Sequence, residues 1–344
     1  MYRYVDGNVA IAPTPSIEEL GPLSSRFKLV VILVDEEEAG YPRSLWKRYG
    51  VETVYEPIPA LQGIEIPRLH RIVKKIANFV AKGRGDVLIH CFAGRGRSGM
   101  VAAAYLAYRY GLDGRKAIEF VRQRVPGAIE TRDQEAVVET YAYLLRMLGY
   151  EALDAVVALG NRFEWGSRDD GARHATAVTI FATRFLNALS TELGIDRDGA
   201  VAMLIASLLH DVGRALGEPH HEYSYRAILG SEELRVLPRN IVELAALIAL
   251  HHRESTDPRN DSRTASYRNI VLPLIGIVRT ANALDALHRW SVADVALELR
   301  SSRIVVKAFC RDSVDGCSYE VSNAYRRSVL LRETLARDIY IVCS

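Results

Sequence analysis

Val87-Leu-Ile-His-Cys-Phe-Ala-Gly-Arg-Gly-Arg-Ser-Gly99 is the stretch of sequence that decides the fold of the N-terminal half. It begins with a short apolar run of strand length that ends at His90-Cys91. The segment 100–110 that follows is apolar and alanine-rich, which predicts a buried helix. The loop between strand and helix is rich in glycine, and the backbone N–H groups of such a loop can point inward at an anion. The sequence therefore predicts a phosphate-binding loop with the thiol of Cys91 at its base.

The residues around Cys91 favour its reactive thiolate form. Loop N–H groups, the helix N-terminus and the charge of Arg97 all stabilise a negative sulfur. The planar fork of Arg97 can also hold two phosphate oxygens. In-line attack by the sulfur would give a cysteinyl phosphate that water releases, with Ser98 hydrogen-bonding the departing sulfur. The alternative is a buried cysteine beside a glycine turn. It does not explain why His90, Cys91, Arg97, Ser98 and Gly99 occur together between a strand and a helix.

The rest of the N-terminal half alternates between the two kinds of periodicity. Continuous or weaker apolar runs predict strands, and apolar residues at helical spacing predict helices. The expected strands are 28–34, 51–55 and 86–90, and the expected helices are 68–82, 100–110, 114–125 and 132–148. Strands that alternate with helices predict an α/β domain with a central, mostly parallel sheet flanked by helices.

The pattern changes near residue 150. Apolar helical stripes continue, with no strand between them, until two β-like runs near the end. The expected helices are 173–189, 200–209, 241–250 and 270–287, and the expected strands are 293–299 and 303–309. The sequence therefore predicts two domains, 1–150 and 151–344, the second mostly α-helical with a small terminal β element.

Composition and charge restrict the class of protein. The formal net charge of +2 argues against general binding of nucleic acid. The chain has neither a run of about 18 apolar residues nor a signal-peptide pattern, so we expect a soluble cytoplasmic protein with no membrane partner. Its four cysteines are scattered: Cys91, Cys310, Cys317 and Cys343. We expect no disulfide framework, and a working Cys91 needs a reducing compartment.

His90-Cys91, five further residues and Arg97-Ser-Gly99 resemble the His-Cys-x5-Arg-Ser-Gly signature of cysteine-dependent protein tyrosine and dual-specificity phosphatases. The resemblance covers about residues 1–148 and is greatest to small archaeal members. It implies that the loop positions Phe92, Ala93, Gly94, Arg95 and Gly96 bind the phosphate.

A second stretch, Val121-Arg-Gln-Arg-Val-Pro-Gly-Ala-Ile-Glu-Thr-Arg-Asp-Gln-Glu135, is similar to the Arg-Pro-Gly-x6-Gln segment of the same family. Val125 stands where the family usually has arginine. The resemblance implies that Gln134 positions the hydrolytic water. The alternative for Gln134 is an amide on the surface of a helix.

The general acid departs from the family pattern. The family places an aspartate in a loop before the cysteine, whereas the loop Glu56-Pro-Ile-Pro-Ala-Leu-Gln-Gly-Ile-Glu-Ile-Pro67 has none, and Ala60 stands where archaeal relatives have it. Glu65 is the best substitute by position, ahead of Glu56. Asp35 and Glu36 are further candidates, and each of the four is otherwise a solvated carboxylate. A missing acid typically lowers the rate by about 10²–10⁴-fold, less for an acidic leaving group such as a phenol or a phosphoanhydride.

Arg95 adds a second basic side chain to the loop. In the family, a basic residue at this place accompanies more highly charged substrates, including inositol phospholipids. The alternative is an arginine that faces solvent.

Histidines gather in the second half. His174 lies on a predicted helix, Leu208-Leu-His-Asp-Val-Gly213 follows an apolar one, and further pairs occur at His220-His221 and His251-His252. An adjacent His-Asp pair and a distant histidine supply mixed nitrogen and oxygen ligands for a divalent metal.

This half resembles the HD superfamily of metal-dependent phosphohydrolases, and most of all the C-terminal domain of exopolyphosphatases and guanosine pentaphosphate phosphohydrolases. The matching stretches are 208–214, 220–225, 250–253 and 281–289. The resemblance implies a metal set of His174, His210, Asp211 and a late aspartate. Asn282 replaces the usual aspartate, so Asp285, one helical turn further on, is expected to compensate. The expected cofactor is Mn, Mg or Fe here and none at the cysteine site; the alternative is a degenerate domain that only binds, orients or dimerises.

These observations predict a phosphatase that hydrolyses phosphomonoesters, of phosphotyrosine or dual-specificity type, through a cysteinyl phosphate. The second domain would regulate it or hold a second phosphohydrolase site. One alternative is a hydrolase of polyphosphate or nucleotide phosphoanhydrides, and another is a phosphate-binding module with little turnover. The expected partners are a phosphorylated protein or a small polyanionic phosphate, and a homodimer is one option for the oligomeric state.

Overall fold

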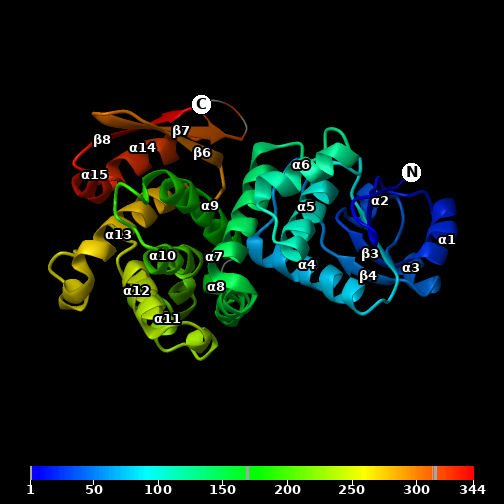
Figure 1. The fold of residues 1–344 in the computed structure, drawn as a ribbon, viewed down its shortest axis with the longest axis horizontal. Helices are drawn as coiled ribbons and strands as arrows, with labels where there is room; N and C mark the ends of the chain where they lie inside the picture. The colour runs from blue at the N-terminus through cyan, green and yellow to red at the C-terminus, as the bar shows by residue number, and fades with distance from the viewer. Residues whose placement is uncertain (1, 168–169, 312, 314–315) are drawn as a thin grey trace. The chain divides into compact units, whose positions relative to one another are not determined.

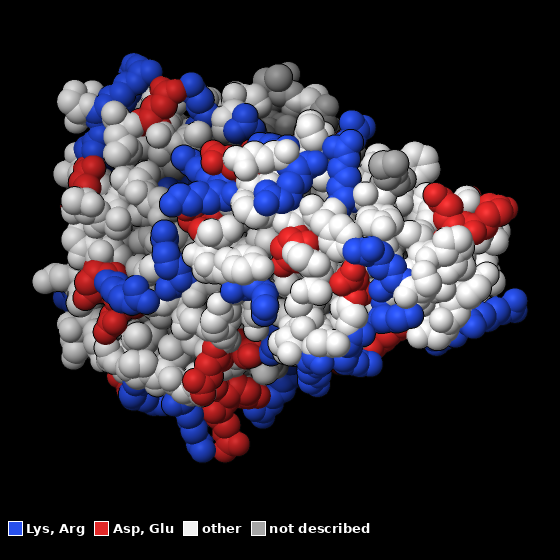
Figure 2. Space-filling model, turned by 45° about the vertical axis from the view of Figure 1, so that its right-hand side comes forward, with Lys and Arg blue, Asp and Glu red and all other residues white. Residues whose placement is uncertain are grey.

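The chain forms two compact units, Met1–Arg146 and Met147–Ser344, each with its own buried apolar side chains (Figure 1). The structure is a computed structural model and describes residues 2–167, 170–311, 313 and 316–344. On the face shown in Figure 2, basic and acidic side chains are interspersed, in keeping with the formal net charge of +2.

The first unit is built on a five-stranded sheet in the order β1-β2-β5-β3-β4. Its strands are β1 (Arg3–Tyr4), β2 (Val9–Ala12), β3 (Phe27–Ile32), β4 (Glu52–Tyr55) and β5 (Asp86–His90). All neighbours are parallel except β1 and β2, which are antiparallel. The predicted mostly parallel sheet is confirmed, and β1 and β2 extend it beyond the expected strands.

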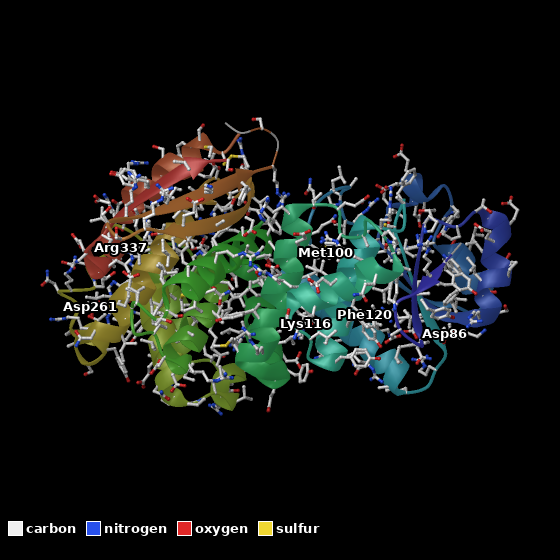
Figure 3. All side chains as sticks on the ribbon, turned by 45° about the horizontal axis from the view of Figure 1, so that its top comes forward. Asp86, Met100, Lys116, Phe120, Asp261 and Arg337 are labelled. Carbon is white, nitrogen blue, oxygen red and sulfur yellow. A yellow bond between two sulfur atoms is a disulfide. The ribbon has the colours of Figure 1, made fainter. Side chains whose placement is uncertain are left out.

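Seven helices of the described chain accompany this sheet. They are α1 (Ile17–Arg26), α2 (Glu36–Ala39), α3 (Ser44–Arg48), α4 (Ile66–Ala81), α5 (Gly96–Tyr110), α6 (Gly114–Arg124) and α7 (Arg132–Arg162). Almost every residue of α5 is buried, as its alanine-rich sequence predicts. In Figure 3, the labels Asp86 and Met100 mark β5 and α5, the two elements that flank the predicted loop. Helix α7 breaks at Gly149, whose φ is +79°.

The second unit begins at Met147 inside α7, and packed helices follow the end of α7. They are α8 (Glu164–Ser167), α9 (Gly171–Leu189), α10 (Arg197–Leu209), η1 (Val212–Leu216), α11 (His220–Leu229), η2 (Glu233–Val236), α12 (Arg239–Leu250), η3 (Ser262–Tyr267) and α13 (Arg268–Ala283). The stretch Arg197–Leu216 is long and apolar enough for a membrane span, but 83% of its most apolar window is buried in the fold. Core helices of globular domains have the same composition, so this is weak evidence for a span.

A three-stranded sheet closes the second unit, in the order β6-β7-β8. Its elements are β6 (Val292–Leu299), β7 (Arg303–Cys310), α14 (Ser318–Arg327), α15 (Val329–Leu335) and β8 (Asp338–Cys343). The two predicted strands are present as β6 and β7, which pair antiparallel, and β8 pairs in parallel with β7. Cys310 and Cys317 form a disulfide that the sequence analysis did not expect.

Candidate functional site

Cys91 follows the carboxyl end of β5, the central strand of the first sheet, and the loop 91–95 leads from it into α5. Only 2% of Cys91 is exposed. Thr14 fixes the loop, because its hydroxyl donates to the Cys91 carbonyl at 2.9 Å and its N–H to the Phe92 carbonyl at 3.1 Å. The predicted strand, loop and helix are therefore present, with the thiol at the base of the loop.

Close approaches require two glycines here, Gly94 in the loop and Gly96 at the start of α5. Gly94 has a φ of +70°, and a Cβ there would lie 2.3 Å from the backbone nitrogen of Pro13. A Cβ on Gly96 would lie 2.4 Å from Oε2 of Glu130 and 3.2 Å from the side-chain amide of Gln134. The loop backbone is thus packed against its neighbours at both positions.

The side chains of Phe92, Ala93 and Arg95 are exposed, so these positions present their backbone rather than their side chains to the interior of the loop. Ser98 is fully buried, and its hydroxyl lies 3.4 Å from the sulfur of Cys91. That distance suits a hydrogen bond to sulfur, as the predicted role of Ser98 requires.

Arg97 is only 5% exposed and is held by a carboxylate that the sequence analysis did not identify. Its two terminal nitrogens donate to the oxygens of Glu38 at 2.8 and 2.5 Å, and Nη1 also donates to the Ile58 carbonyl at 2.8 Å. Burial lowers the pKa of Arg97, but Glu38 and Cys91 raise it, with a net rise. The guanidinium is therefore charged and fixed in orientation. Glu38 lies in an acidic run just after β3. That run is the only feature of the sequence that could have indicated a partner for Arg97.

His90 is fully buried under the loop, and its Nε2 lies 2.9 Å from the hydroxyl of Tyr41. Burial lowers the pKa of His90 to about 4 and raises that of Tyr41 to about 12. The imidazole is thus neutral at pH 7, and His90 supports the loop without adding charge.

Gln134 is fully buried, not a surface amide. Its Oε1 accepts the Glu130 N–H at 2.9 Å and its Nε2 donates to the Gln62 carbonyl at 3.3 Å. Together with its closeness to Gly96, these bonds hold the amide beside the phosphate-binding loop.

The four carboxylates considered as general acids are all engaged elsewhere. Oε2 of Glu65 pairs with Arg68 at 3.0 Å. The other three also have structural partners: Glu56 pairs with Arg68 and Arg71, Asp35 caps α2, and Glu36 accepts the Arg43 N–H. The role of Glu65 stays a prediction, and none of these contacts aims a carboxylate at Cys91.

Glu130 is a second carboxylate, besides Glu38, that the structure brings to this site. Its Oε2 lies against Gly96, and its Oε1 is 3.7 Å from Nε of Arg95. Its side chain is 29% exposed. It lies within the segment that resembles the family, four residues before Gln134, but the family pattern draws attention only to the glutamine.

Arg95 lies at the edge of a cavity of about 340 Å³. The lining includes Arg3, Pro13, Gly94, Arg95 and Pro126. The side chain of Arg95 is 53% exposed. The loop therefore has a basic pocket beside it, with two arginines.

In the second unit, the structure brings three of the four predicted metal ligands together. Nε2 of His174 lies 3.2 Å from Nε2 of His210, and both nitrogens are 3.9 Å from Oδ2 of Asp211. Asn282 joins them, with its Oδ1 3.0 Å from Nε2 of His174. All three predicted residues are at least nine-tenths buried.

Asp285 does not point into this cluster, contrary to the expectation that it replaces the missing aspartate. Its Oδ2 accepts from Nδ1 of His174 at 2.8 Å, and its Oδ1 accepts the Trp290 N–H at 2.6 Å. Both oxygens are occupied because the chain turns back after α13 ends at Ala283, four residues before the predicted end of this helix. Asp285 thus orients His174 and leaves the position at the cluster to Asn282.

His220 and His252 belong to the same cluster, although the sequence analysis did not include them in the metal set. The Nε2 atom of each lies 3.3 Å from Oδ1 of Asp211. The pairs His220-His221 and His251-His252 were the only sequence feature that could have indicated these two residues. The sequence does not show which member of each pair faces Asp211.

Comparisons with known proteins agree with the N-terminal site. Residues 62–159 match the family model of the dual specificity phosphatase catalytic domain. A stretch of 100 residues is 31% identical to protein tyrosine phosphatase domain-containing protein 1 of Danio rerio, over 29% of this chain and 12% of that protein. Another of 102 residues is 34% identical to cyclin-dependent kinase inhibitor 3 of Rattus norvegicus, over 29% of this chain and 45% of that protein. The chain thus spans less than half the length of these curated relatives.

Among solved structures, Tk-PTP in its active form is 37% identical, with a TM-score of 0.40, over 41% of this chain and 96% of that chain. Over residues 62–159 the chain is therefore similar to dual specificity phosphatase catalytic domains. More particularly, the match to the family model and the similarity to tyrosine phosphatases support a cysteine-dependent phosphatase. The resemblance of the second unit to the HD superfamily stays a prediction.

Proposed function

We propose that the first unit hydrolyses phosphate monoesters with Cys91 as nucleophile. The observation that most directly supports this proposal is the buried thiol at the base of a glycine loop. The hydroxyl of Ser98 lies 3.4 Å from its sulfur, and Arg97 is charged and held in a fixed orientation. The thiolate attacks phosphorus in line, so that an S–P bond forms while the bond from phosphorus to the leaving oxygen breaks. Water then attacks phosphorus, the S–P bond breaks, and inorganic phosphate leaves the regenerated thiolate.

We assign the proton transfers of this reaction to Glu130. A protonated carboxylic acid beside the loop donates its proton to the leaving oxygen in the first step. The resulting carboxylate takes a proton from the attacking water in the second step. Glu130 is the carboxylate beside Gly96 and Gln134, and its 29% exposed side chain leaves room for a substrate to reach it. Glu65 is the competing candidate from the sequence.

The substrate class we propose is an aryl phosphate, as in phosphotyrosine of a protein. Phe92, in the loop itself, is 62% exposed, and Leu61, in the segment that contacts Gln134, is 61% exposed. Exposed apolar side chains at the rim of a site favour an aromatic leaving group. Relatives named as tyrosine phosphatases are consistent with this class.

A second candidate is a substrate with more than one phosphate, such as polyphosphate or a nucleotide. The basic pocket beside the loop, with Arg3 and Arg95, favours it because it would hold a second anionic group. A panel of phosphotyrosine peptide, phosphoserine peptide, nucleotides and polyphosphate, assayed with EDTA present, distinguishes the two classes.

The decisive experiment replaces the sulfur nucleophile. Cys91→Ser is expected to lower hydrolysis of an aryl phosphate by at least about 10³-fold while inorganic phosphate still binds. Cys343→Ser is the matched control, because it makes the same chemical change at a cysteine of the second unit, in β8. It is expected to leave the rate unchanged. Retained hydrolysis in Cys91→Ser would exclude the thiol mechanism.

A further inference from the structure

Three of the four cysteines meet at one end of the sheet in the second unit. Cys310 is the last residue of β7, Cys343 is the last residue of β8, and Cys317 precedes α14 (Figure 1). Because β7 and β8 run in parallel, with Ala308 opposite Cys343, their carboxyl ends lie at the same end of the sheet. The three sulfur atoms all lie within 4.8 Å of one another. We call these three residues the cysteine corner.

The ordinary interpretation of the cysteine corner is a structural cross-link. Cys310 and Cys317 form a disulfide across a sequence separation of 7. A cross-link needs two sulfurs, so it does not explain why the sulfur of Cys343 belongs to the same group. Clustered thiolates are the ligands that zinc and other soft metal ions prefer in proteins. A role for the corner should therefore use all three sulfurs.

The disulfide and the proposed chemistry of Cys91 favour opposite redox conditions. Cys91 attacks phosphorus as a thiolate, and oxidation of its sulfur abolishes that reactivity. Conditions that keep Cys91 reduced also favour reduction of a disulfide that solvent can reach. Cys310 is only partly buried, although Cys317 is fully buried, so a reductant has access to one half of the bond. Where the phosphatase is active, we therefore expect the cysteine corner to hold three thiols.

Reduction of the disulfide is an ordinary thiol exchange. Two molecules of a small thiol, or one of a dithiol, supply two electrons and two protons. The bond between Cys310 and Cys317 breaks, both become thiols, and the reductant forms a disulfide of its own. A divalent ion that then binds displaces the three thiol protons to solvent as three metal–sulfur bonds form.

We propose that Cys310, Cys317 and Cys343 in their reduced form bind one thiophilic metal ion, with Zn²⁺ as the best fit. Two sulfurs on one tetrahedral zinc ion are about 3.8 Å apart, because each Zn–S bond is about 2.3 Å long. Sulfurs that already lie within 4.8 Å of one another reach this spacing by short movements once the disulfide is open. The site uses neither Cys91 nor the predicted histidine ligands, and it goes beyond the proposed phosphatase function.

Three protein ligands leave a fourth position on the ion. Within the described chain, this group contains no histidine, aspartate or glutamate in addition to the three cysteines. Cys310 and Cys343 are only partly buried, so water can reach the ion and complete the tetrahedron. The ion would attach the end of β8 to the end of β7 and the start of α14. It thus replaces the cross-link of the disulfide and adds a third attachment.

Cobalt can report this site separately from any ion that imidazoles bind. Thiolate ligands give Co²⁺ a charge-transfer absorption in the near ultraviolet, and nitrogen and oxygen ligands do not. The full chain is reduced with dithiothreitol, freed of the reductant without air, and titrated with Co²⁺. We expect the band to appear and then to disappear when Zn²⁺, which thiolates prefer, is added. The oxidised chain, with its disulfide intact, should give no such band.

Serine variants identify the ligands. Cys343→Ser is expected to lose most of the cobalt band, because a hydroxyl is a poor ligand for a thiophilic ion. Cys91→Ser makes the same change at the cysteine outside the corner, and as the matched control it should keep the full band. An undiminished band in Cys343→Ser, or a band lost in Cys91→Ser, would overturn the proposal.

A measurement on the wild-type protein does not depend on the folding of a variant. Zn²⁺ at a free concentration 10 times its Kd leaves about one chain in eleven unbound, so alkylation of Cys310 and Cys343 should slow about tenfold. Iodoacetamide labelling of the reduced chain, read out by peptide mass spectrometry, provides these rates, and that of Cys91 should not change. Equal rates with and without Zn²⁺, or no cobalt band in the reduced chain, would overturn the proposal and leave thiol–disulfide exchange as the chemistry of the cysteine corner.

Discussion

At the scale of single residues, the proton donor is the part of the phosphatase site that the family pattern leaves open. Glu130→Gln is expected to lower kcat for a phosphate ester with a basic leaving group by about 10²–10⁴-fold, because the amide cannot donate the proton. For an ester of an acidic phenol the loss should be smaller. The basic limb of the pH–rate profile should also flatten, since that limb reports loss of the donated proton.

Glu65→Gln is the matched comparison for this prediction. It carries the same chemical change on a carboxylate that is paired with Arg68. Its profile should keep the basic limb and the ratio between the two leaving groups. If Glu65→Gln shows the leaving-group effect and Glu130→Gln does not, the assignment is reversed and the original sequence prediction holds.

The titration of His90 should make the stability of the first unit depend on pH. Its pKa is lowered by burial to about 4, against 6.5 for an exposed imidazole. The unfolded chain therefore takes up a proton below pH 6.5 while the folded chain does not until about pH 4. The free energy of unfolding is thus highest above pH 6.5 and falls by up to about 3 kcal/mol as the pH drops to 4.

His90→Gln should remove this part of the pH dependence, because glutamine does not titrate and can still bond the hydroxyl of Tyr41. Urea unfolding of the wild-type protein and the variant at pH 7 and pH 4.5 provides the measurement. Equal losses of stability in the two proteins would show that His90 is not the titrating group.

At the scale of elements, the strand–loop–helix unit depends on the conformation at Gly94. A side chain there must adopt a φ of +70° and would meet the backbone of Pro13 at 2.3 Å. Gly94→Ala should therefore displace the loop, and a displacement of 1 Å can lower the rate by about 10²-fold. Gly111→Ala separates the two effects, since Gly111 has a φ of +65° but no atom within 4 Å of the added Cβ.

We expect Gly111→Ala to lower the free energy of unfolding by about 1 kcal/mol, the usual penalty for a left-handed residue, and to keep the phosphatase rate. Aryl phosphate kinetics and thermal melts of the two variants compare them directly. Equal rates in the two variants would mean that the loop tolerates the approach to Pro13.

The elements also show why the sequence predicts some parts of the site and not others. Cys91, Arg97 and Ser98 lie in one continuous stretch, so local spacing was enough to place them. Glu38 reaches Arg97 from beyond another strand, and a pattern along the chain cannot reveal that pair. Glu130 lies inside a motif that was noted, but its direction depends on how α7 packs on the loop.

The histidines of the second unit were likewise only partly predictable from the sequence. The sequence showed which pairs exist, but the phase of each helix end decides that His252 faces Asp211 while His251 faces Asp261. Asp285 does not face the other predicted ligands, because its two oxygens accept hydrogen bonds from His174 and the Trp290 N–H. Strand β8 was missed since it pairs with β7 across two intervening helices, a contact that no local period encodes.

At the scale of the whole molecule, we expect the proposed thiol chemistry of the first unit to be independent of metal bound by the second. The thiol site is built from residues of the first unit and contains none of the predicted metal ligands His174, His210 and Asp211. Removal of metal with EDTA should therefore leave the hydrolysis of an aryl phosphate unchanged. A rate that falls with EDTA and returns with Mn²⁺ would show instead that the metal site drives or controls the phosphatase.

The same treatment should change the stability of the second unit alone. An ion that binds only the folded state stabilises it by about 2.7 kcal/mol at a free concentration 100 times its Kd. Hydrogen exchange resolves where this stabilisation acts: Mn²⁺ should slow exchange in α9, which holds His174, and in α10, which precedes His210, and leave α5 unaffected. Since His251→Ala retains every predicted ligand, it should show the same protection, whereas Asp211→Asn should lose it. Protection of α5 by Mn²⁺ would contradict the separation of the two sites.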